Sequence, residues 1–410
     1  MRAKFSSEIL SSPDNAEMAS IMRSCVHCGF CNATCPTYGL RGDELDGPRG
    51  RIYLIKSMLE DAAVTEETQS HLDRCLTCRA CETTCPSGVK YGRLVELARP
   101  LVDERVGRTL LERLERRLIR LIIPNTRRFG FLMAIARLLR PIFPAALREF
   151  VPPVIPSAKA ILNSSHERKM LLLDGCVQPV TGPEINAAAH AVFDRLGVEL
   201  LTLPNAGCCG AVSYHLGKVA EAQRYARQNV DTWHAALESG AEAVVSTSTG
   251  CTAMLKEYGE LLAGDPAYAK RAQEVAAAVR DPSEVLDAGE LGRAYQVKSE
   301  QHIAFHAPCS MQHSLHVADN AEACLRAVGF ELTSVPDGHL CCGSAGSYSL
   351  LQPRLSSELL DQKLTALQSD GPTVIASANI GCLMHLRRRA EPRVQHWLEL
   401  ISAHEVADAD

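Results

Sequence analysis

The spacing of hydrophobic residues predicts the same series of elements twice in the C-terminal part of the chain. In the first copy, apolar residues 170–173 predict a buried strand, residues 184–196 have helical spacing, and residues 198–203 predict a second strand. A longer helix over 219–238 and a strand over 243–246 complete this copy. This order of elements is typical of an α/β unit.

A second copy repeats that order. It has predicted strands at 303–305, 331–335 and 374–376, with helices at 321–328 and 354–367 between them. Cysteines at corresponding places in the two copies lie 133, 133 and 131 residues apart. The sequence therefore predicts a duplicated α/β region.

The N-terminal part is predicted to contain shorter helices. Pro13 and the polar residues after it predict the start of a lead-in helix that continues into Ile21 and Met22. Residues 43–51 are rich in turn formers, and residues 52–59 then have helical spacing. We expect this second helix to link two cysteine-rich loops.

Residues 105–150 are basic and amphipathic, with eleven arginines against three glutamates interleaved with leucine, isoleucine and phenylalanine. Two interpretations stay open. The segment lies on an anionic membrane face or an acidic partner, or it packs its apolar stripe onto its own domain and leaves the arginines in water. A proline cluster then predicts a domain boundary, at Pro141, Pro144, Pro152, Pro153 and Pro156.

Composition limits the classes of function. A chain of 410 residues is long enough for two or three domains. A net charge of -5 and a pI near 6.3 give no general attraction to nucleic acid. The content of 46% hydrophobic and 22% charged residues is typical of a soluble globular protein, and no apolar run approaches the length of a membrane span.

Seventeen cysteines are far above ordinary usage, and sixteen fall into patterned groups, which favours metal binding. The pattern C-x2-C-x2-C-x3-C-P occurs twice, and bacterial two-cluster ferredoxins use the same run. Three thiolates of one run are expected to hold one cluster while the fourth reaches the other. The predicted ligands are Cys25, Cys28, Cys31 and Cys85 for one [4Fe-4S] cluster, and Cys75, Cys78, Cys81 and Cys35 for the second.

Zinc binding and disulfide formation explain less of this cysteine pattern than iron–sulfur clusters do. Structural zinc needs only two C-x2-C pairs, so it leaves half of the cysteines and both prolines without a role. Disulfides are not expected, because no signal peptide precedes the cysteines. Four nearby arginines either raise the potential of the negatively charged clusters or are ordinary solvated side chains: Arg49, Arg51, Arg74 and Arg79.

The duplicated region carries a second cysteine pattern. Its candidate ligands are Cys176, Cys208, Cys209 and Cys251 in the first copy, and Cys309, Cys341, Cys342 and Cys382 in the second. The pattern resembles the cysteine-rich "CCG" domain of heterodisulfide reductases, which implies further, non-cubane iron–sulfur centres. Met254 and His385 stand where that family has its last cysteine, so His385 is a candidate ligand and a retained fold with residual thiols is the alternative. Cys324 stands alone and is expected in the core.

The predicted fold class is α+β. A helical two-cluster ferredoxin-like domain is followed by a pseudo-twofold duplicated CCG region. The predicted domains are residues 1–104 (ferredoxin-type), 105–168 (basic helical and proline-rich linker), 169–254 (first CCG domain), 255–300 (helical insertion) and 301–410 (second CCG domain).

Four stretches together resemble the iron–sulfur subunits of bacterial glycolate oxidases: residues 24–31, 42–53, 339–346 and 378–382. This resemblance runs almost from end to end. It implies a subunit of a heteromeric, membrane-associated complex that oxidises glycolate to glyoxylate, with FAD on separate subunits and a quinone or another electron acceptor. The implied location is the cytoplasmic face of the inner membrane, as a peripheral protein, or the cytoplasm.

The residues agree with an electron-transfer role. No G-x-G-x-x-G follows a predicted strand and no P-loop occurs, so the chain has no evident site for a two-electron organic cofactor. We therefore expect it to relay electrons and to be inactive alone. The alternatives are the electron-transfer subunit of another flavoprotein dehydrogenase, acting on glycerol-3-phosphate or lactate, and a self-contained heterodisulfide-reductase-like enzyme.

Overall fold

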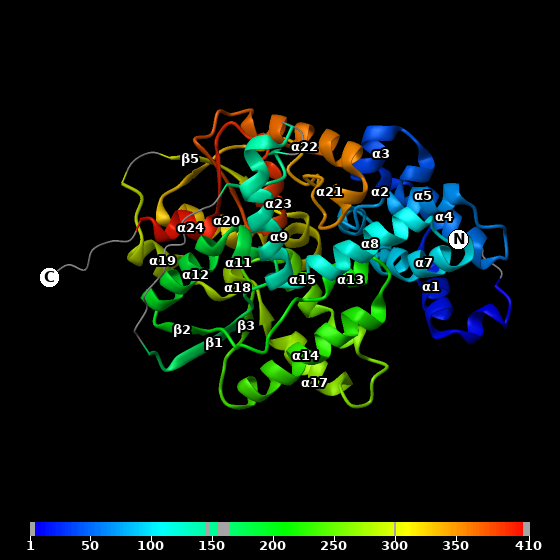
Figure 1. The fold of residues 1–410 in the computed structure, drawn as a ribbon, viewed down its shortest axis with the longest axis horizontal. Coiled ribbons are helices and arrows are strands. Elements are labelled where there is room, and N and C mark those ends of the chain that lie inside the picture. Colours follow the sequence, from blue (N-terminus) through cyan, green and yellow to red (C-terminus); the bar gives the residue numbers. More distant parts are fainter. Residues whose placement is uncertain (1–4, 145–147, 154–164, 299–300, 405–410) are drawn as a thin grey trace. The chain divides into compact units, whose positions relative to one another are not determined.

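The computed structural model describes residues 5–144, 148–153, 165–298 and 301–404. Parts of the predicted linker (145–147 and 154–164, with Pro156), the end of the predicted insertion (299–300) and residues 405–410 lie outside the described residues. Contacts between residues divide the chain into two units. Figure 1 labels the helices and strands from which they are built. The first comprises Met1–Arg117, Tyr214–Lys218 and His339–Lys363, and the second comprises Leu118–Ser213, Val219–Gly338 and Leu364–Asp410.

The first unit is helical. Its longer helices share one apolar core, in which Met22, Ile55 and Leu94 are fully buried. The predicted lead-in helix is confirmed, and the linking helix begins at Pro48, because proline is favoured in the first turn of a helix. The elements are η1 (Ile9–Ser11), α1 (Pro13–Ser24), α2 (Phe30–Ala33), α3 (Pro36–Arg41), η2 (Glu44–Asp46), α4 (Pro48–Leu59), α5 (Glu66–Asp73), α6 (Ala80–Thr83), α7 (Tyr91–Val106) and α21 (Tyr348–Leu351).

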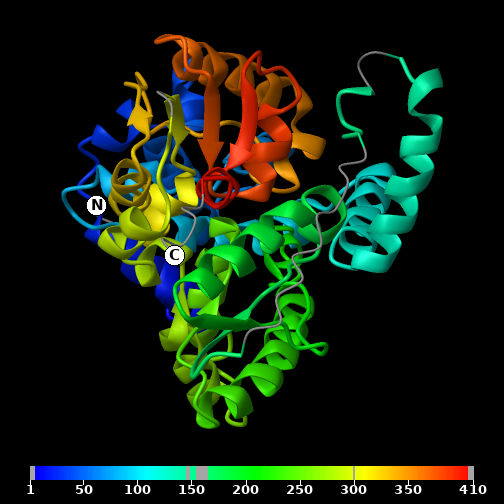
Figure 2. The same cartoon turned by 90° about the vertical axis from the view of Figure 1, so that its left-hand side faces the viewer.

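The second unit contains two four-stranded sheets with the same topology. Their strand orders are β2-β1-β3-β4 and β6-β5-β7-β8, and every pairing is parallel. Figure 2 shows β7 and β8 as orange and red arrows that run in the same direction. The strands are β1 (Arg168–Leu172), β2 (Val198–Leu201), β3 (Val244–Val245), β4 (Val279–Arg280), β5 (His302–His306), β6 (Glu331–Leu332), β7 (Val374–Ser377) and β8 (Arg393–His396). The predicted α+β class and the duplication are confirmed.

Helices surround the strands of the second unit. Its helices are α9 (Thr126–Leu139), η3 (Arg140–Ile142), α11 (Gln178–Thr181), α12 (Pro183–Arg195), α14 (Val219–Glu238), α15 (Thr249–Lys256), α16 (Tyr258–Leu261), α17 (Ala269–Ala278), α18 (Pro282–Val285), α19 (Ala288–Ala294), the π-helix η4 (Ser310–Leu315), α20 (Ala318–Val328), α23 (Ile380–Leu386) and α24 (Trp397–Ser402). Residues of both units occur in α8 (Leu110–Ile122), α13 (Ala211–His215) and α22 (Pro353–Gln368). Among the described residues, no helix combines the length and the apolar character that crossing a bilayer requires.

Two strands were not predicted. β4 lies inside residues 255–300, where only helices were expected, and β8 follows α23 near the end of the chain. β4 has two residues and β8 has four, of which three are polar or charged, so neither has a readable apolar alternation. Each completes its sheet as the fourth strand.

The two sheets are joined by one buried apolar core that includes Phe193, Phe305 and Trp397. A buried histidine adds a polar link between the copies: His396 Nε2 lies 2.9 Å from the carbonyl oxygen of Thr247, while Nδ1 accepts a hydrogen bond from Leu398 N at 3.2 Å. Burial lowers the pKa of His396 to about 3. Its imidazole is therefore neutral, with the proton on Nε2.

The low pKa of His396 in the folded protein predicts a loss of stability in mild acid. Because the folded pKa of about 3 lies below the model-peptide value, the unfolded state takes up a proton as pH falls below about 6.5 while the folded state does not. Because of His396, the free energy of unfolding should then decrease by about 1.4 kcal/mol for each pH unit below this value. Denaturant unfolding of the anaerobic full chain should show a shallower pH dependence between pH 7.5 and 5.5 for His396→Gln.

His302 supplies the control, because its side chain is half-exposed. The change of slope in His396→Gln should exceed that in His302→Gln. An unchanged slope in His396→Gln would contradict the assignment of a buried neutral imidazole.

Candidate metal centres

One cavity of the first unit collects thiols from both ferredoxin-type runs. Its lining includes Cys25, Cys28 and Cys31 from the first run, and Cys81 and Cys85 from the second. The pKa of Cys31 is raised to about 11, by burial first and then by the neighbouring thiols, Cys25, Cys85 and Cys28. Cys85 therefore lies among the first three cysteines of the other run. A set of thiols in one cavity suits an iron–sulfur cluster chemically.

The remaining cysteines of the two runs also lie near one another. The pKa of Cys81 is raised well above its usual value by burial and then by Cys78, Cys75 and Cys35. Hydroxyl groups tie the two loops together, since Thr34 Oγ1 donates to the carbonyl oxygen of Ala80 at 3.3 Å. Cys35 ends one loop directly before the helix that begins at Pro36.

A buried arginine lies beside this second group. Arg51 is only 1% exposed, and its Nε donates to the carbonyl oxygen of His71 at 2.7 Å. Its Nη2 donates to Thr37 Oγ1 at 3.1 Å, and that hydroxyl lies 3.3 Å from Cys35 Sγ. The guanidinium is thus separated from a cysteine sulfur by a single hydroxyl group.

Arginine charge favours the thiolate form of Cys75. Burial alone raises the pKa of Cys75, but the charges of Arg51 and Arg99 outweigh it and leave the pKa lowered. The sulfur also accepts hydrogen bonds from Thr77 N at 3.4 Å and from Tyr91 Oη at 3.8 Å. Thiolate is the form that binds metal, so this environment prepares Cys75 as a ligand.

Asp46 holds Arg51 and Arg74 in place. Its carboxylate is fully buried, accepts from Arg74 Nη1 at 3.1 Å, and lies 3.6 Å from Arg51 Nη2 and 2.8 Å from His71 Nδ1. Ligand atoms of Asp43, Asp46 and His71 lie within 4.8 Å of one another. Because three guanidinium groups already form ion pairs with Asp46, those of Arg41, Arg51 and Arg74, this group is an ion-pair network and a poor site for a metal cation.

The other predicted arginines have different surroundings. Arg49 forms an ion pair with Glu44 at 2.6 Å and remains partly exposed. Arg79 Nη2 lies 3.9 Å from the buried carboxylate of Glu96. Of the four arginines noted near the thiolate loops, Arg51 is therefore the buried one that lies beside the cysteine sulfurs.

The first CCG copy brings all four of its predicted cysteines together. Cys176 follows β1, Cys208 and Cys209 follow β2, and Cys251 lies in α15. The Sγ atoms of Cys176 and Cys208 are 3.6 Å apart. Hydrogen bonding with Cys176 and Cys209 raises the pKa of Cys208 well above its usual value, and hydrogen bonding with Cys209 does the same for Cys251. The thiols thus form one continuous group, in which Cys176, Cys208 and Cys209 are buried and Cys251 is half-buried.

Two buried polar side chains fix the loop of this copy. Asn229 of α14 accepts from Gly207 N at 2.8 Å and donates to the carbonyl oxygen of Cys208 at 3.1 Å. Tyr258 donates to the carbonyl oxygen of Cys209 at 2.9 Å and accepts from Asn229 Nδ2. Met254, in the place of the family's last cysteine, is buried in α15.

The second CCG loop has the same local geometry and belongs to the first unit. Gly343 N donates to Cys341 Sγ at 3.5 Å, as Gly210 N does to Cys208 Sγ at 3.4 Å in the first copy. Gly343 has φ +89°, and a Cβ atom there would lie 2.6 Å from the carbonyl oxygen of Ser356, so no larger residue fits. Downstream of the loop, Tyr348 Oη donates to the carbonyl oxygen of Arg74 at 3.2 Å.

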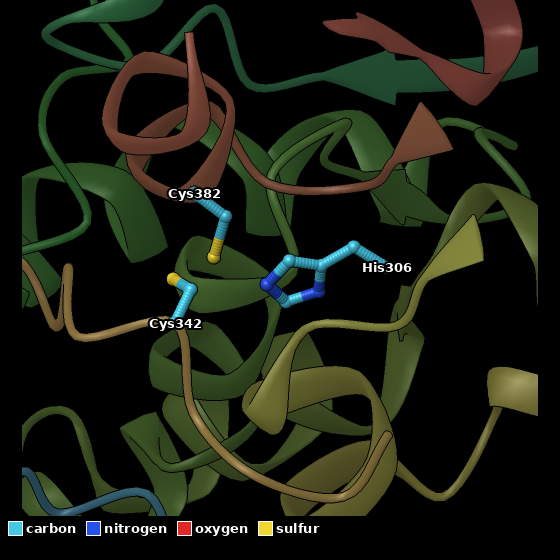
Figure 3. Close-up of side chains that lie close together, drawn as sticks. All are labelled: His306, Cys342 and Cys382. Atoms are coloured by element: carbon cyan, nitrogen blue, oxygen red, sulfur yellow. The ribbon is translucent and has the colours of Figure 1, made fainter. Parts of the chain in front are cut away.

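Other candidate ligands of the second copy belong to the second unit. Cys382 lies in α23, accepts from Asn379 Nδ2 at 3.3 Å, and lies with its Sγ within 4.8 Å of a ring nitrogen of His306 (Figure 3). Half-buried Cys309 directly precedes η4. His385 is buried in α23, with Nδ1 3.3 Å from the guanidinium of Arg388.

Sequence reasoning missed His306. The residue ends β5 and is buried, whereas Leu173 stands 133 residues earlier in the first copy. A titratable side chain directly after the predicted apolar strand 303–305 was the available signal, because sites in α/β folds lie at the carboxyl ends of parallel strands. Cys324, by contrast, lies in the core as predicted.

Comparisons with known proteins match the segments that carry both cysteine patterns. A 4Fe-4S dicluster domain matches residues 21–89, and a cysteine-rich domain matches residues 170–256 and 303–387. A crystal structure of a hypothetical protein from Helicobacter pylori has a TM-score of 0.55 at 8% identity, covering 95% of this chain and 72% of that one, which shows similarity of fold.

Curated relatives cover nearly the whole chain. The glycolate oxidase iron-sulfur subunit of Escherichia coli is 46% identical over 98% of both chains, and the probable glycolate oxidase iron-sulfur subunit of Bacillus subtilis is 30% identical over 89% of this chain and 88% of its own. Lactate utilization protein A of Bacillus velezensis is 30% identical over 57% of this chain and 99% of its own. With its paired ferredoxin-type runs and two cysteine-rich domains, the chain belongs to the family of glycolate oxidase iron–sulfur subunits.

Proposed function

We propose that this chain relays electrons within a membrane-associated complex that oxidises glycolate to glyoxylate. FAD is held by partner subunits, and a quinone-type molecule accepts the electrons. The observation that carries this proposal is the meeting of thiols from two distant cysteine runs in one unit. It is supported by the 46% identity to the glycolate oxidase iron-sulfur subunit of Escherichia coli over 98% of this chain. Iron–sulfur clusters supply one-electron transfer between a flavin and an acceptor.

The crossed arrangement of ligands is part of the proposal. Cys25, Cys28, Cys31 and Cys85 hold one [4Fe-4S] cluster, and Cys75, Cys78, Cys81 and Cys35 hold the other. The cavity that includes Cys85 among the cysteines of the first run supports the first set. The effects of Cys78, Cys75 and Cys35 on the pKa of Cys81 support the second set.

The first CCG copy is proposed to bind an additional iron–sulfur centre. Its support is the group formed by Cys176, Cys208, Cys209 and Cys251, with a loop fixed by Asn229 and Tyr258. Four thiols that converge behind a rigid loop are a suitable donor set for iron. Cys309, Cys341, Cys342 and Cys382 remain candidate ligands in the second copy, and His306 joins His385 as a candidate there.

Lactate oxidation is the second candidate function. It is favoured by the lactate utilization proteins, but these match only a little over half of this chain, whereas the glycolate oxidase subunit matches nearly all of it. Glycolate therefore has the stronger support. Substrate oxidation by the flavoprotein that co-purifies with this chain distinguishes the two candidates.

The relay predicts that flavin reduction and acceptor reduction can be separated. The chain alone should not oxidise glycolate. In the complex, Cys78→Ser should slow reduction of a quinone-type acceptor by about tenfold or more, because a poorer ligand replaces a thiolate. Stopped-flow absorbance should still show the flavin being reduced by glycolate at the unchanged rate.

Cys324→Ser is the matched control, since Cys324 lies in the apolar core of the second unit and belongs to neither cysteine run. It should leave acceptor reduction intact. Glycolate turnover by the isolated chain, or full acceptor reduction in Cys78→Ser, would refute the relay.

Occupation of the first CCG copy predicts more iron than two cubane clusters contain. Anaerobic analysis of the full chain should give clearly more than about eight irons per chain. The double variant Cys208→Ser/Cys251→Ser should lower this content while the EPR signals of the two ferredoxin-type clusters persist. A content of about eight irons in the unsubstituted chain would show that the CCG copies hold no iron.

A further inference from the structure

Helix α8 turns an apolar stripe away from the protein. Leu110 and Leu111 are 82% and 75% exposed, and three further leucines on the helix are also exposed. At 3.6 residues per turn, all five lie within about 100° of the helix circumference. We call these residues the leucine stripe: Leu110, Leu111, Leu114, Leu118 and Leu121.

Polar contacts of α8 anchor a different part of its circumference. Arg116 pairs with Asp73 at 3.1 Å, and Arg120 pairs with Glu221. Ile119, which projects opposite the stripe, is the buried residue of this helix. The alternative in which the segment packs its apolar stripe inward is therefore wrong for α8.

The next helix repeats the exposure of apolar side chains. Phe131 and Leu138 of α9 are largely exposed, and Ile142 directly after it is too. Arg137 projects from another part of α9 and donates to the carbonyl oxygens of Pro152 and Val180. Exposure of large apolar residues on consecutive helices is uncommon for a surface that faces only water.

Among the described residues, arginines that pair with no carboxylate border the leucine stripe, although Arg113 Nε donates to the carbonyl oxygen of Arg108 at 2.7 Å. Arg113 and Arg117 lie next to it on the helix circumference, and Arg127 and Arg128 follow at the start of α9. Within the described part of the chain, no carboxylate forms an ion pair with any of these four. The segment is thus cationic although the chain as a whole has a net charge of -5.

We propose that the leucine stripe lies on a bilayer surface with anionic headgroups, with Arg113 and Arg117 at the level of the lipid phosphates. This rests on the proposed function, in which the complex is membrane-associated. Leucine with flanking arginine is the pattern of helices that lie in the plane of a membrane interface. Leucine is under-represented among the energetically dominant residues of protein interfaces, so a protein partner fits this face less well.

Vesicle flotation tests the proposal with the anaerobically purified full chain. The protein should float with vesicles of phosphatidylcholine and phosphatidylglycerol, float less at high salt, and float poorly with phosphatidylcholine alone. Leu111→Gln/Leu114→Gln should weaken partitioning into the anionic vesicles by about tenfold or more. Arg113→Gln/Arg117→Gln should remove most of the salt dependence.

The control is Val219→Gln/Leu350→Gln, which changes two exposed apolar residues elsewhere on the chain. It should bind vesicles like the unsubstituted protein. All variants should keep the same iron content and visible absorbance, because the replaced side chains are exposed.

Unchanged vesicle binding in Leu111→Gln/Leu114→Gln would overturn the proposal. Loss of the flavoprotein subunits from that variant, with vesicle binding retained, would also overturn it and assign the stripe to a protein interface. Failure of the proposed function is distinguishable: the complex would then not pass electrons from glycolate to a water-soluble dye, whether or not the chain binds vesicles.

Discussion

The first unit depends on the compensation of buried thiolate charge. Cys35, Cys75 and Cys81 are all buried, and a cluster with four thiolate ligands carries net negative charge. Arg51 lies among these groups as a buried cation. Burial alone lowers the pKa of Arg51, but neighbouring Tyr91 and the thiols of Cys75 and Cys35 outweigh it, so the pKa is raised and the side chain stays charged.

The position of Arg51 in turn depends on a fixed set of partners. The carbonyl of His71, the hydroxyl of Thr37 and the carboxylate of Asp46 surround its guanidinium. Removing one member of a buried ion pair costs about 3–5 kcal/mol, because the other charge is left uncompensated. Under the proposed assignment of Cys35 and Cys75 as cluster ligands, a positive charge at this place favours the reduced, more negative cluster and so raises its potential. Stability and electron transfer therefore depend on the same contacts.

The two copies of the duplicated region share one topology, but their cysteines have different surroundings. The first copy keeps four thiols in one group, with Asn229 and Tyr258 holding the loop. The loop of the second copy belongs to the unit that contains the ferredoxin-type runs. There Tyr348 contacts the backbone of Arg74, one residue before Cys75. This difference agrees with a relay in which the copies have different roles.

Local patterns were sufficient to predict much of this architecture. The cysteine runs, the duplication and helix α14 follow from spacing that a few neighbouring residues define. Arg51 could be placed only near the thiolate loops, because its burial depends on Thr37 and on His71, 14 and 20 residues away. The short strand β4 was missed for the same reason, since pairing with β3 determines it. His306 was missed although it directly follows the predicted strand 303–305, where the carboxyl end of a strand was a local signal.

The central claim, that electrons pass through this chain, is tested most directly by freeze-quench EPR of the complex mixed with glycolate. The account predicts that reduced-cluster signals appear after flavin reduction and disappear when a quinone is added. A flavin that is reduced and then reoxidised by quinone, while the clusters stay oxidised throughout, would contradict it.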